Sequence, residues 1–369
     1  MAEPQLEELA DAGPLGLRVA TGSAQVQAAA RALDVAPAAL ATTLTDPDLR
    51  LLVGDRGDIA LLRRAWADDG HAEAVLVRRR GALVARPAVL AVASAWGCER
   101  VRDAATGELV AVPTPPDDAP LPARFLHLAA LAATRVEVAV ALARDAGQES
   151  TKADGSPSLG ADEAAHLAAA HVLRPLGVAV LSEERRDRSV AGDEPWVVLD
   201  PLDGTGNFRA GLPPWAFSAG LVQSGRPVAG LVADLSSGRR WQGALGSGAR
   251  RDGVPVRPRS GGTLVVPTAP PGEAVAVPAG VRRVRVTGCT AVDLCLVADG
   301  SAAAWHDVDR GGTHVHDVAG GLAVLAAAGG VALTEDGEPL VLRPDTETLI
   351  RLVAAGNEKT ARAVLGAVG

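Results

Sequence analysis

Two aspartates three residues apart are the pair in this sequence best suited to hold a metal ion. Asp200 and Asp203 belong to the run Asp200–Phe208, which reads DPLDGTGNF. Two carboxylates this close repel each other unless a cation lies between them. Hard oxygen ligands suit Mg²⁺, which usually shares its shell with a substrate phosphate. If a helix begins after Gly204, the amides of Gly204 and Thr205 are placed to bind that phosphate.

The element that must position this run is the short apolar segment just before it. Trp196–Leu199 (WVVL) is typical of a buried strand. Pro201 stiffens the turn that follows, and Gly204 lets the backbone come close to a ligand. An ordinary surface turn is the alternative, because Asp, Pro and Gly are common turn residues. The preceding strand and the distant partner motifs favour the metal site.

Taken together, these motifs resemble the inositol monophosphatase family of Mg²⁺-dependent, lithium-sensitive phosphomonoesterases. The family reads Asp-Pro-Ile/Leu-Asp-Gly-Thr-x-Asn-Phe where this chain has Asp200–Phe208. Its second motif is Trp-Asp followed by a helix and Gly-Gly. Here His316 replaces the tryptophan, while Asp317 is retained and opens a helix that runs to Gly329–Gly330. The resemblance covers about residues 121–369 and implies an α/β fold, a layered α-β-α-β-α sandwich.

Three shorter motifs fit the same resemblance. Lys152–Pro157 and Asp162 fall where the family has Lys-x-Asp-x-Ser-Pro-Val-Thr-x-Ala-Asp, although the threonine is missing here. Ser182–Glu184 matches its Gly/Ser-Glu-Glu motif, and Asp307 or Asp309 matches an acid near the Trp-Asp motif. Taken alone, Asp162 is better explained as a first-turn acid of a helix over Glu163–Leu173.

The resemblance implies a role for each matched residue. The ligands of two or three Mg²⁺ ions would be the side chains of Glu183, Asp200, Asp203 and Asp317 and the carbonyl of Leu202. The catalytic residues would be Asp162 and Thr205, which polarise the attacking water as a pair, with Glu183 and Lys152. Substrate would contact Gly204, Thr205 and Asp307, with Asp309 as the alternative to Asp307.

These roles predict hydrolysis of a small phosphate monoester, of the inositol or sugar phosphate type, by metal-activated water. Asn207–Phe208 favours inositol monophosphatases, whereas Ser182 and Leu202 favour 3'(2'),5'-bisphosphate nucleotidases. Histidinol-phosphatases, fructose-1,6-bisphosphatases and phosphatases of specialised metabolites stay open. A non-catalytic metal-binding scaffold is the alternative of another class, disfavoured because clustered unpaired acids are costly. A zinc site at His306, His314 and His316 is also disfavoured, since they lack helical i, i+4 spacing.

Composition limits the remaining possibilities. The 369 residues are 48% hydrophobic and carry a net charge of −8, which predicts a large core and disfavours nucleic-acid binding. Cys98, Cys289 and Cys295 lack metal-type spacing, which favours reduced thiols and a cytoplasmic location. We find no signal peptide or membrane span. The expected partner is a small phosphorylated metabolite, and a homodimer stays open.

The sequence predicts two domains. Residues 1–112 form a small α/β domain of unknown function, with a strand at Leu49–Val53 and helices at Ile59–Trp66 and Pro87–Trp96. This part faintly resembles aminoacyl-tRNA deacylase domains over Ala29–Pro37 and Thr42–Leu44, although Thr42 or Thr43 replaces their lysine. Residues 113–122 form a proline-rich linker, and residues 123–369 form the phosphatase-like domain.

Overall fold

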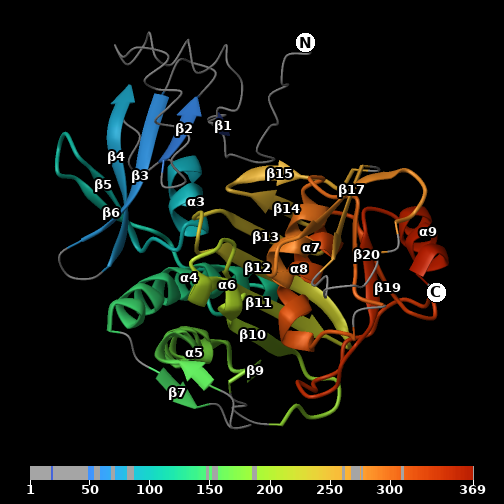
Figure 1. The fold of residues 1–369 in the computed structure, drawn as a ribbon. Coiled ribbons are helices and arrows are strands. Elements are labelled where there is room, and N and C mark those ends of the chain that lie inside the picture. The colour runs from blue at the N-terminus through green and yellow to red at the C-terminus, as the bar shows by residue number, and fades with distance from the viewer. Residues whose placement is uncertain are drawn as a thin grey trace. The chain divides into compact units, whose positions relative to one another are not determined.

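The computed structural model describes most of the chain and divides it into two compact units. The described residues are 18–19, 49–53, 59–67, 71–80, 87–146, 149–151, 157–184, 189–259, 262–266, 275, 277–308 and 311–368. The first unit comprises Met1–Pro116 with Asp252–Pro255, and the second Asp117–Arg251 with Val256–Gly369. Figure 1 shows the elements of both.

The first unit contains a six-stranded sheet in which the strands follow one another in chain order. The strands are β1 (Arg18–Val19), β2 (Leu49–Val53), β3 (Ile59–Trp66), β4 (Ala72–Arg80), β5 (Arg100–Asp103) and β6 (Leu109–Ala111). Only β4 and β5 pair in parallel, and α3 (Pro87–Ala95) connects them. Leu52, Leu62, Leu76 and Val89 pack into one buried cluster. The segments that resemble deacylase domains lie outside the described residues.

The helix expected at Ile59–Trp66 is wrong, because this segment is strand β3. Its sequence, IALLRRAW, is apolar enough for either element. As β3 it pairs with β2 on one side and β4 on the other, so both sides of its backbone are hydrogen-bonded. Tertiary pairing therefore decides the structure of a segment whose short apolar pattern fits both helix and strand.

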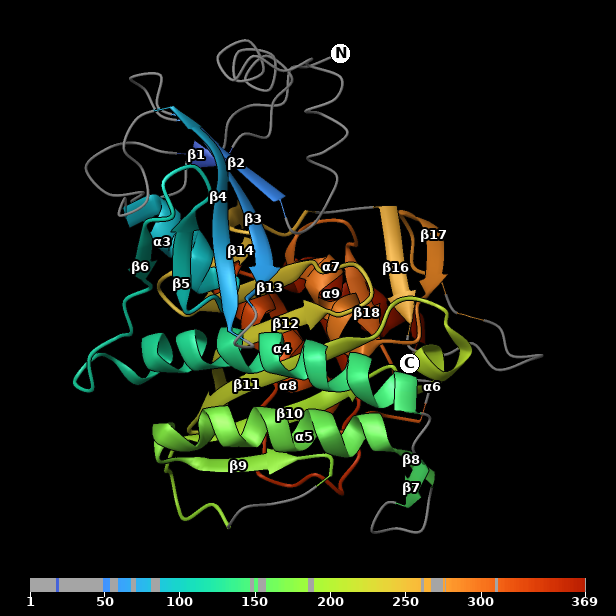
Figure 2. The ribbon, with the colours of Figure 1, turned by 90° about the vertical axis from the view of Figure 1, so that its left-hand side faces the viewer.

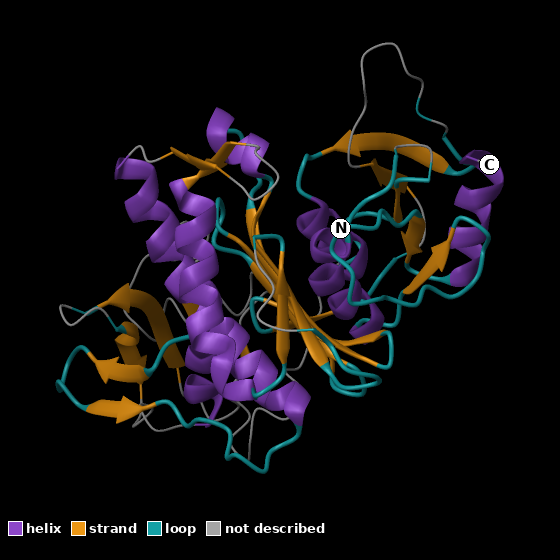
Figure 3. Ribbon diagram, turned by 90° about the horizontal axis from the view of Figure 1, so that it is seen from below, coloured by secondary structure: helices purple, strands orange, loops and turns teal. Residues whose placement is uncertain are grey.

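The second unit is built of five layers, which confirms the predicted sandwich. Helices α4 (Leu121–Ala146) and α5 (Gly160–Leu173) cover one face of a seven-stranded sheet, as Figure 2 shows. On its other face lie α7 (Thr290–Ala298) and α8 (Val315–Ala327), which separate it from a five-stranded sheet. Helix α9 (Glu358–Val368) packs against the far side of that second sheet, and Figure 3 shows the layers edge-on.

The strand that carries Asp200 and Asp203 is the second strand from one edge of the larger sheet. The seven-stranded sheet runs β15-β14-β13-β12-β11-β10-β9 and the five-stranded sheet β17-β16-β18-β20-β19. The first sheet contains β9 (Ala179–Ser182), β10 (Trp196–Asp203), β11 (Ala216–Gln223), β12 (Arg226–Asp234), β13 (Arg240–Ala244), β14 (Gly248–Arg251) and β15 (Val254–Val256). The second contains β16 (Gly262–Val266), β17 (Val281–Val286), β18 (Ala304–His306), β19 (Val331–Thr334) and β20 (Leu352–Ala355). A separate hairpin joins β7 (Glu149–Thr151) to β8 (Pro157–Leu159), and η2 (Arg174–Leu176) follows α5.

Strand β10 extends further than the sequence predicts. The expected strand Trp196–Leu199 continues through Asp200 to Asp203, and every residue of it is buried. Its pairing with β11 shifts register between Asp200 and Asp203. Such an irregularity accommodates Pro201, which has no N–H to donate to the ladder. The two aspartates are thus carried by the sheet itself.

Helix α8 lies unusually close to the larger sheet. A Cβ built on Gly220 of β11 would lie 2.7 Å from the carbonyl carbon of Ala319. On Gly230 of β12 it would collide with the carbonyl oxygen of Gly320. Glycine is therefore required at both strand positions, and the N-terminus of α8 is held firmly against the sheet.

Helix α4 begins at Leu121, inside the segment expected to be linker, with Pro120 just before it and Pro122 in its first turn. By length and composition alone it passes as a membrane span, with a mean hydropathy of 1.6 in an 18-residue window of Leu121–Arg144. Its apolar face, including Phe125, Ala133 and Val136, is packed in the core beneath the larger sheet. The core helix of a folded domain passes the same test of length and composition.

Candidate active site

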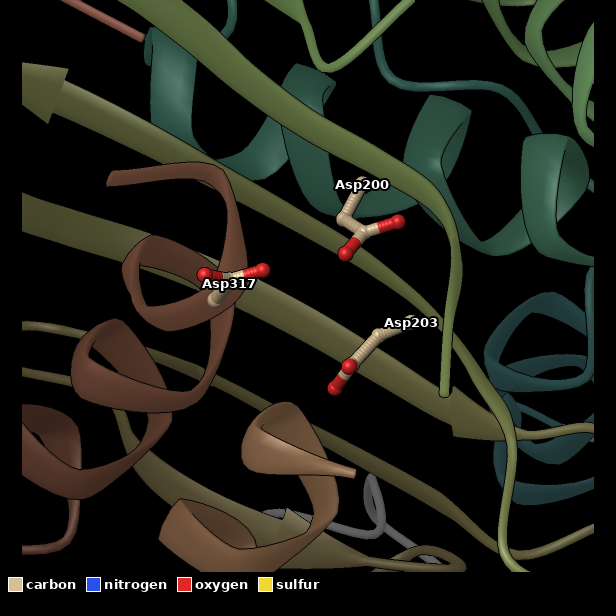
Figure 4. Close-up of side chains that lie close together, drawn as sticks. All are labelled: Asp200, Asp203 and Asp317. Carbon is tan, nitrogen blue, oxygen red and sulfur yellow. The ribbon is translucent and has the colours of Figure 1, made fainter. Parts of the chain in front are cut away.

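Three aspartates from two distant parts of the chain form a carboxylate cluster. Asp200 and Asp203 come from β10, and Asp317 comes from the first turn of α8. One side-chain oxygen of each lies within 4.8 Å of those of the other two. Figure 4 shows the three side chains turned toward one another. Asp200 is 2% and Asp203 8% exposed, so bulk water screens this cluster poorly.

The electrostatics of the cluster favour a cation. Burial raises the pKa of Asp200, and the neighbouring charges of Glu183, Asp203 and Asp317 raise it further. Burial and then the charge of Asp317 raise the pKa of Asp203 to about 7, against the opposing hydrogen bond from the Ala291 amide. A divalent cation would relieve this repulsion, and three carboxylates are hard oxygen ligands of the kind Mg²⁺ binds. The residues present therefore fit a divalent metal.

Side chains and amides outside the predicted set hold the carboxylates in place. Asp203 Oδ2 accepts hydrogen bonds from the Ala291 amide at 2.7 Å and from Cys289 Sγ at 3.2 Å. Asp317 Oδ2 accepts the Thr313 hydroxyl at 2.7 Å and the His314 amide at 2.9 Å. The sequence interpretation missed all four donors. The two donors to Asp317 are local, since Thr313 and His314 lie four and three residues before it at the start of α8.

Thr205 and Asp162 lie side by side. Gly204 adopts a left-handed conformation (φ 84°), and α6 (Thr205–Ala210) begins directly after it. The Thr205 hydroxyl lies 3.3 Å from Asp162 Oδ1 and 3.0 Å from the Leu202 carbonyl oxygen. Since a hydroxyl has one proton, it donates to one of these acceptors at a time. Asp162 is only 3% exposed and lies in the first turn of α5. Its position as a first-turn acid is therefore compatible with its contact with Thr205.

Glu183 stands beside the cluster but outside it. It follows β9 directly, and its amide donates to the Leu199 carbonyl at 3.2 Å. Its side chain is exposed and does not join the three-carboxylate group found among the described residues. Its charge still contributes to the raised pKa of Asp200, which places the two acids near each other.

The remaining predicted residues are distributed differently. Lys152 and Asp309 lie outside the described residues. Asp307 follows β18, is completely buried, and accepts a hydrogen bond from the Leu352 amide at 2.9 Å. Burial raises its pKa to about 7, against that hydrogen bond. Its second oxygen has no hydrogen-bond partner among the described residues.

The histidines do not form a metal group within the described part of the chain. The only cluster of three or more ligand-type side chains found there is the aspartate trio, and no histidine belongs to it. His314 and His316 instead stack their rings, with centroids 5.1 Å apart. His316 Nε2 lies 3.6 Å from Asp317 Oδ1.

Asn207 links α6 to the loop between β17 and α7. Its amide nitrogen donates to the Pro214 carbonyl at 2.8 Å and to the Thr287 carbonyl at 2.7 Å. Gly204 is confined by the same loops, because a Cβ there would lie 3.1 Å from the Pro214 oxygen. The backbone of α6 is therefore fixed relative to the loop that leads into α7.

The five layers define an α/β sandwich with an acidic cluster between β10 and α8, and comparison with known proteins identifies its family. The model of the inositol monophosphatase family matches residues 126–368, and the chain belongs to that family.

Relatives and solved structures agree with this assignment. The fructose-1,6-bisphosphatase/inositol-1-monophosphatase of Thermococcus kodakarensis is 32% identical over 198 residues, 53% of this chain and 77% of that protein. The protein of the same name from Archaeoglobus fulgidus is 33% identical over 212 residues, 56% of this chain and 81% of that one. The fold of a Pyrococcus horikoshii protein described as similar to inositol-1 monophosphatase matches with a TM-score of 0.58 at 23% identity. That match covers 66% of this chain and 98% of the other.

Proposed function

We propose that this protein is a Mg²⁺-dependent phosphatase that hydrolyses a small phosphate monoester of the inositol or sugar phosphate type. As a member of its family it is a phosphoric monoester hydrolase. The observation that supports the proposal most strongly is the convergence of three buried carboxylates next to the Thr205–Asp162 pair. The three buried cysteines form no disulfide, which supports a cytoplasmic location.

The carboxylates supply the binding charge. Asp200, Asp203 and Asp317 would hold Mg²⁺, with Glu183 and the Leu202 carbonyl beside them. When bound, the ion neutralises charge on the phosphoryl oxygens and lowers the pKa of a water molecule. The residues that hold it are preorganised, since Asp203 and Asp317 each have one oxygen fixed by two donors.

The Thr205–Asp162 pair supplies the path for a proton. Thr205 Oγ1 can accept a proton from an attacking water while its own proton passes to Asp162 Oδ1, 3.3 Å away. Asp162 is nearly fully buried, so its carboxylate keeps a fixed orientation for this transfer. Positioned proton transfer of this kind typically contributes 10²–10⁴-fold in rate.

Substrate is proposed to contact Gly204, Thr205 and Asp307. The Gly204–Thr205 backbone leads into α6 and presents amides to a phosphate. We include Asp307, which is completely buried, on its match to the family motif alone. We include Lys152 as a further catalytic residue on its match to the family motif alone.

A hydrolysis screen tests the proposal. Inositol 1-phosphate, fructose 1,6-bisphosphate, histidinol phosphate and a 3',5'-bisphosphate nucleotide are each incubated with and without Mg²⁺. We expect Mg²⁺-dependent phosphate release, inhibited by Li⁺, with the first two preferred because similar relatives carry both names. Fructose 1,6-bisphosphate cleaved faster than inositol 1-phosphate would make bisphosphatase activity the main function. No release from any substrate would refute the proposal.

A further inference from the structure

We infer that Cys289 is a positioning residue that orients the Asp203 carboxylate toward the bound cation. The inference rests on the proposed metal site. Cys289 Sγ donates to Asp203 Oδ2 at 3.2 Å and also lies 3.7 Å from the Asp203 carbonyl oxygen. The Ala291 amide donates to the same Oδ2 at 2.7 Å. With both donors on Oδ2, the carboxylate is turned so that Oδ1 is the oxygen left to approach a cation.

The thiol itself is held rigidly. Cys289 is the residue before α7, has extended backbone angles (φ −145°, ψ 98°) and is 1% exposed. The Cys289 side chain packs against the loop that follows Asp203, since a Cβ built on Gly204 would lie 3.3 Å from the Cys289 Cβ. Its side chain therefore has little room to take another rotamer.

A second set of contacts fixes the loop that carries the thiol. The Thr287 hydroxyl donates to Asp293 Oδ1 at 2.5 Å, and the Cys289 amide donates to Thr287 Oγ1 at 3.3 Å. The Thr287 carbonyl accepts the amide nitrogen of Asn207 at 2.7 Å. Because Asn207 lies four residues after Asp203, both ends of the thiol–carboxylate contact are anchored to the same frame.

The chemistry of sulfur gives this contact a specific effect. A thiol is a weak hydrogen-bond donor, so it steers a carboxylate while withdrawing little of its charge. Removal of partners that orient metal ligands typically costs 10–100-fold in metal affinity or activity. The role of Cys289 is therefore measurable as metal affinity, with no substrate needed.

Cys295, inside α7, provides a matched control for Cys289. Cys295 is completely buried and Cys289 is 1% exposed, but among the described residues only the Cys289 thiol is found to donate a hydrogen bond to Asp203. The variants C289A, C289S, C295A and C295S are compared as full-length, metal-free protein. Mg²⁺ and Mn²⁺ dissociation constants are measured by calorimetry, and the electron paramagnetic resonance spectrum of bound Mn²⁺ reports ligand geometry.

We expect C289A to bind both ions about tenfold more weakly and to change the Mn²⁺ spectrum. C289S should recover most of the affinity, because a hydroxyl can also donate to Asp203. C295A and C295S should lose thermal stability while keeping the wild-type dissociation constants. If C289A does not fold, C289V removes the donor with a side chain of similar size and carries the same test.

Two outcomes separate this inference from the proposed function. Wild-type affinity in C289A or C289V, or an equal loss in C295A, would overturn the positioning role of Cys289. Wild-type protein that binds neither ion would instead overturn the metal site itself. Failure to hydrolyse any phosphate ester leaves the binding measurement, and hence the test of Cys289, unaffected.

Discussion

Asp200 is a buried acid whose charge is unfavourable for the fold. It is buried in the sheet, and burial and three neighbouring acids raise its pKa. Such a group destabilises the metal-free protein when charged and becomes favourable only beside a cation. Substitutions in the cluster should therefore separate stability from activity.

We expect Asp200→Asn to abolish hydrolysis while the metal-free protein stays folded and melts no lower than wild type. The change removes charge from a buried cluster without changing side-chain volume. Addition of Mg²⁺ should no longer raise the melting temperature. Glu347→Gln, at an exposed position, is the control and should leave the Mg²⁺ response intact. Wild-type turnover in D200N would exclude Asp200 from the site.

At Thr205, the hydroxyl and the side-chain volume can be tested apart. Thr205→Val keeps the shape but removes the donor to Asp162, so we expect kcat to fall by about 10²–10⁴-fold. Thr205→Ser should retain most of the activity. Steady-state kinetics at saturating Mg²⁺ measures both variants. Equal activity of Thr205→Val and Thr205→Ser would contradict the proposed proton path.

At the scale of helices and strands, the sequence predicted the elements that depend on residues close to one another in the chain. Trp196–Leu199 predicted a strand, which is present as β10, and the helix on which phosphate binding at Gly204 was made conditional is present as α6. The donors from Cys289 and Ala291 come from 86 and 88 residues away, so no local pattern could reveal them. Strand β3 was mistaken for a helix for the same reason, because its two partner strands decide its structure.

The link between α6 and the loop before α7 gives a test at this scale. Asn207→Ala removes two hydrogen bonds and leaves two carbonyls without that donor, so we expect about 1–3 kcal/mol of lost stability. Because α6 carries Thr205, turnover should fall as well. Chemical denaturation and kinetics measure the two effects.

The chain's other asparagine is a natural control for this test. Asn357 accepts the Thr360 amide at 2.9 Å at the start of α9, away from the carboxylate cluster. Asn357→Ala should cost about 1 kcal/mol, as lost helix caps do, with full activity. If both variants lose activity equally, the link through Asn207 has no special role.

For the molecule as a whole, stability should depend on pH and metal together. Asp203 and Asp307 both have their pKa raised to about 7, mainly by burial. Between the ordinary aspartate range and pH 7 the folded protein binds more protons than the unfolded chain, so stability falls as pH rises through that interval.

We therefore expect metal-free protein to melt at a lower temperature at pH 8 than at pH 5.5. Mg²⁺ at a hundred times its dissociation constant should restore about 2.7 kcal/mol at pH 8. At pH 5.5 the same addition should help less, because protons compete for the carboxylates. Calorimetric scans in chelator and in Mg²⁺ measure this, and a melting temperature that rises with pH in chelator would contradict it.

The glycine contacts between α8 and the larger sheet have a consequence for the rate at which the ion arrives. Backbone meets backbone at Gly220 and Gly230, so Asp317 cannot drift from Asp200 and Asp203 without separating two packed layers. The three carboxylates should then have the same spacing in the metal-free protein as around the bound ion. The rate of Mg²⁺ binding would then be limited by the loss of the ion's own hydration waters.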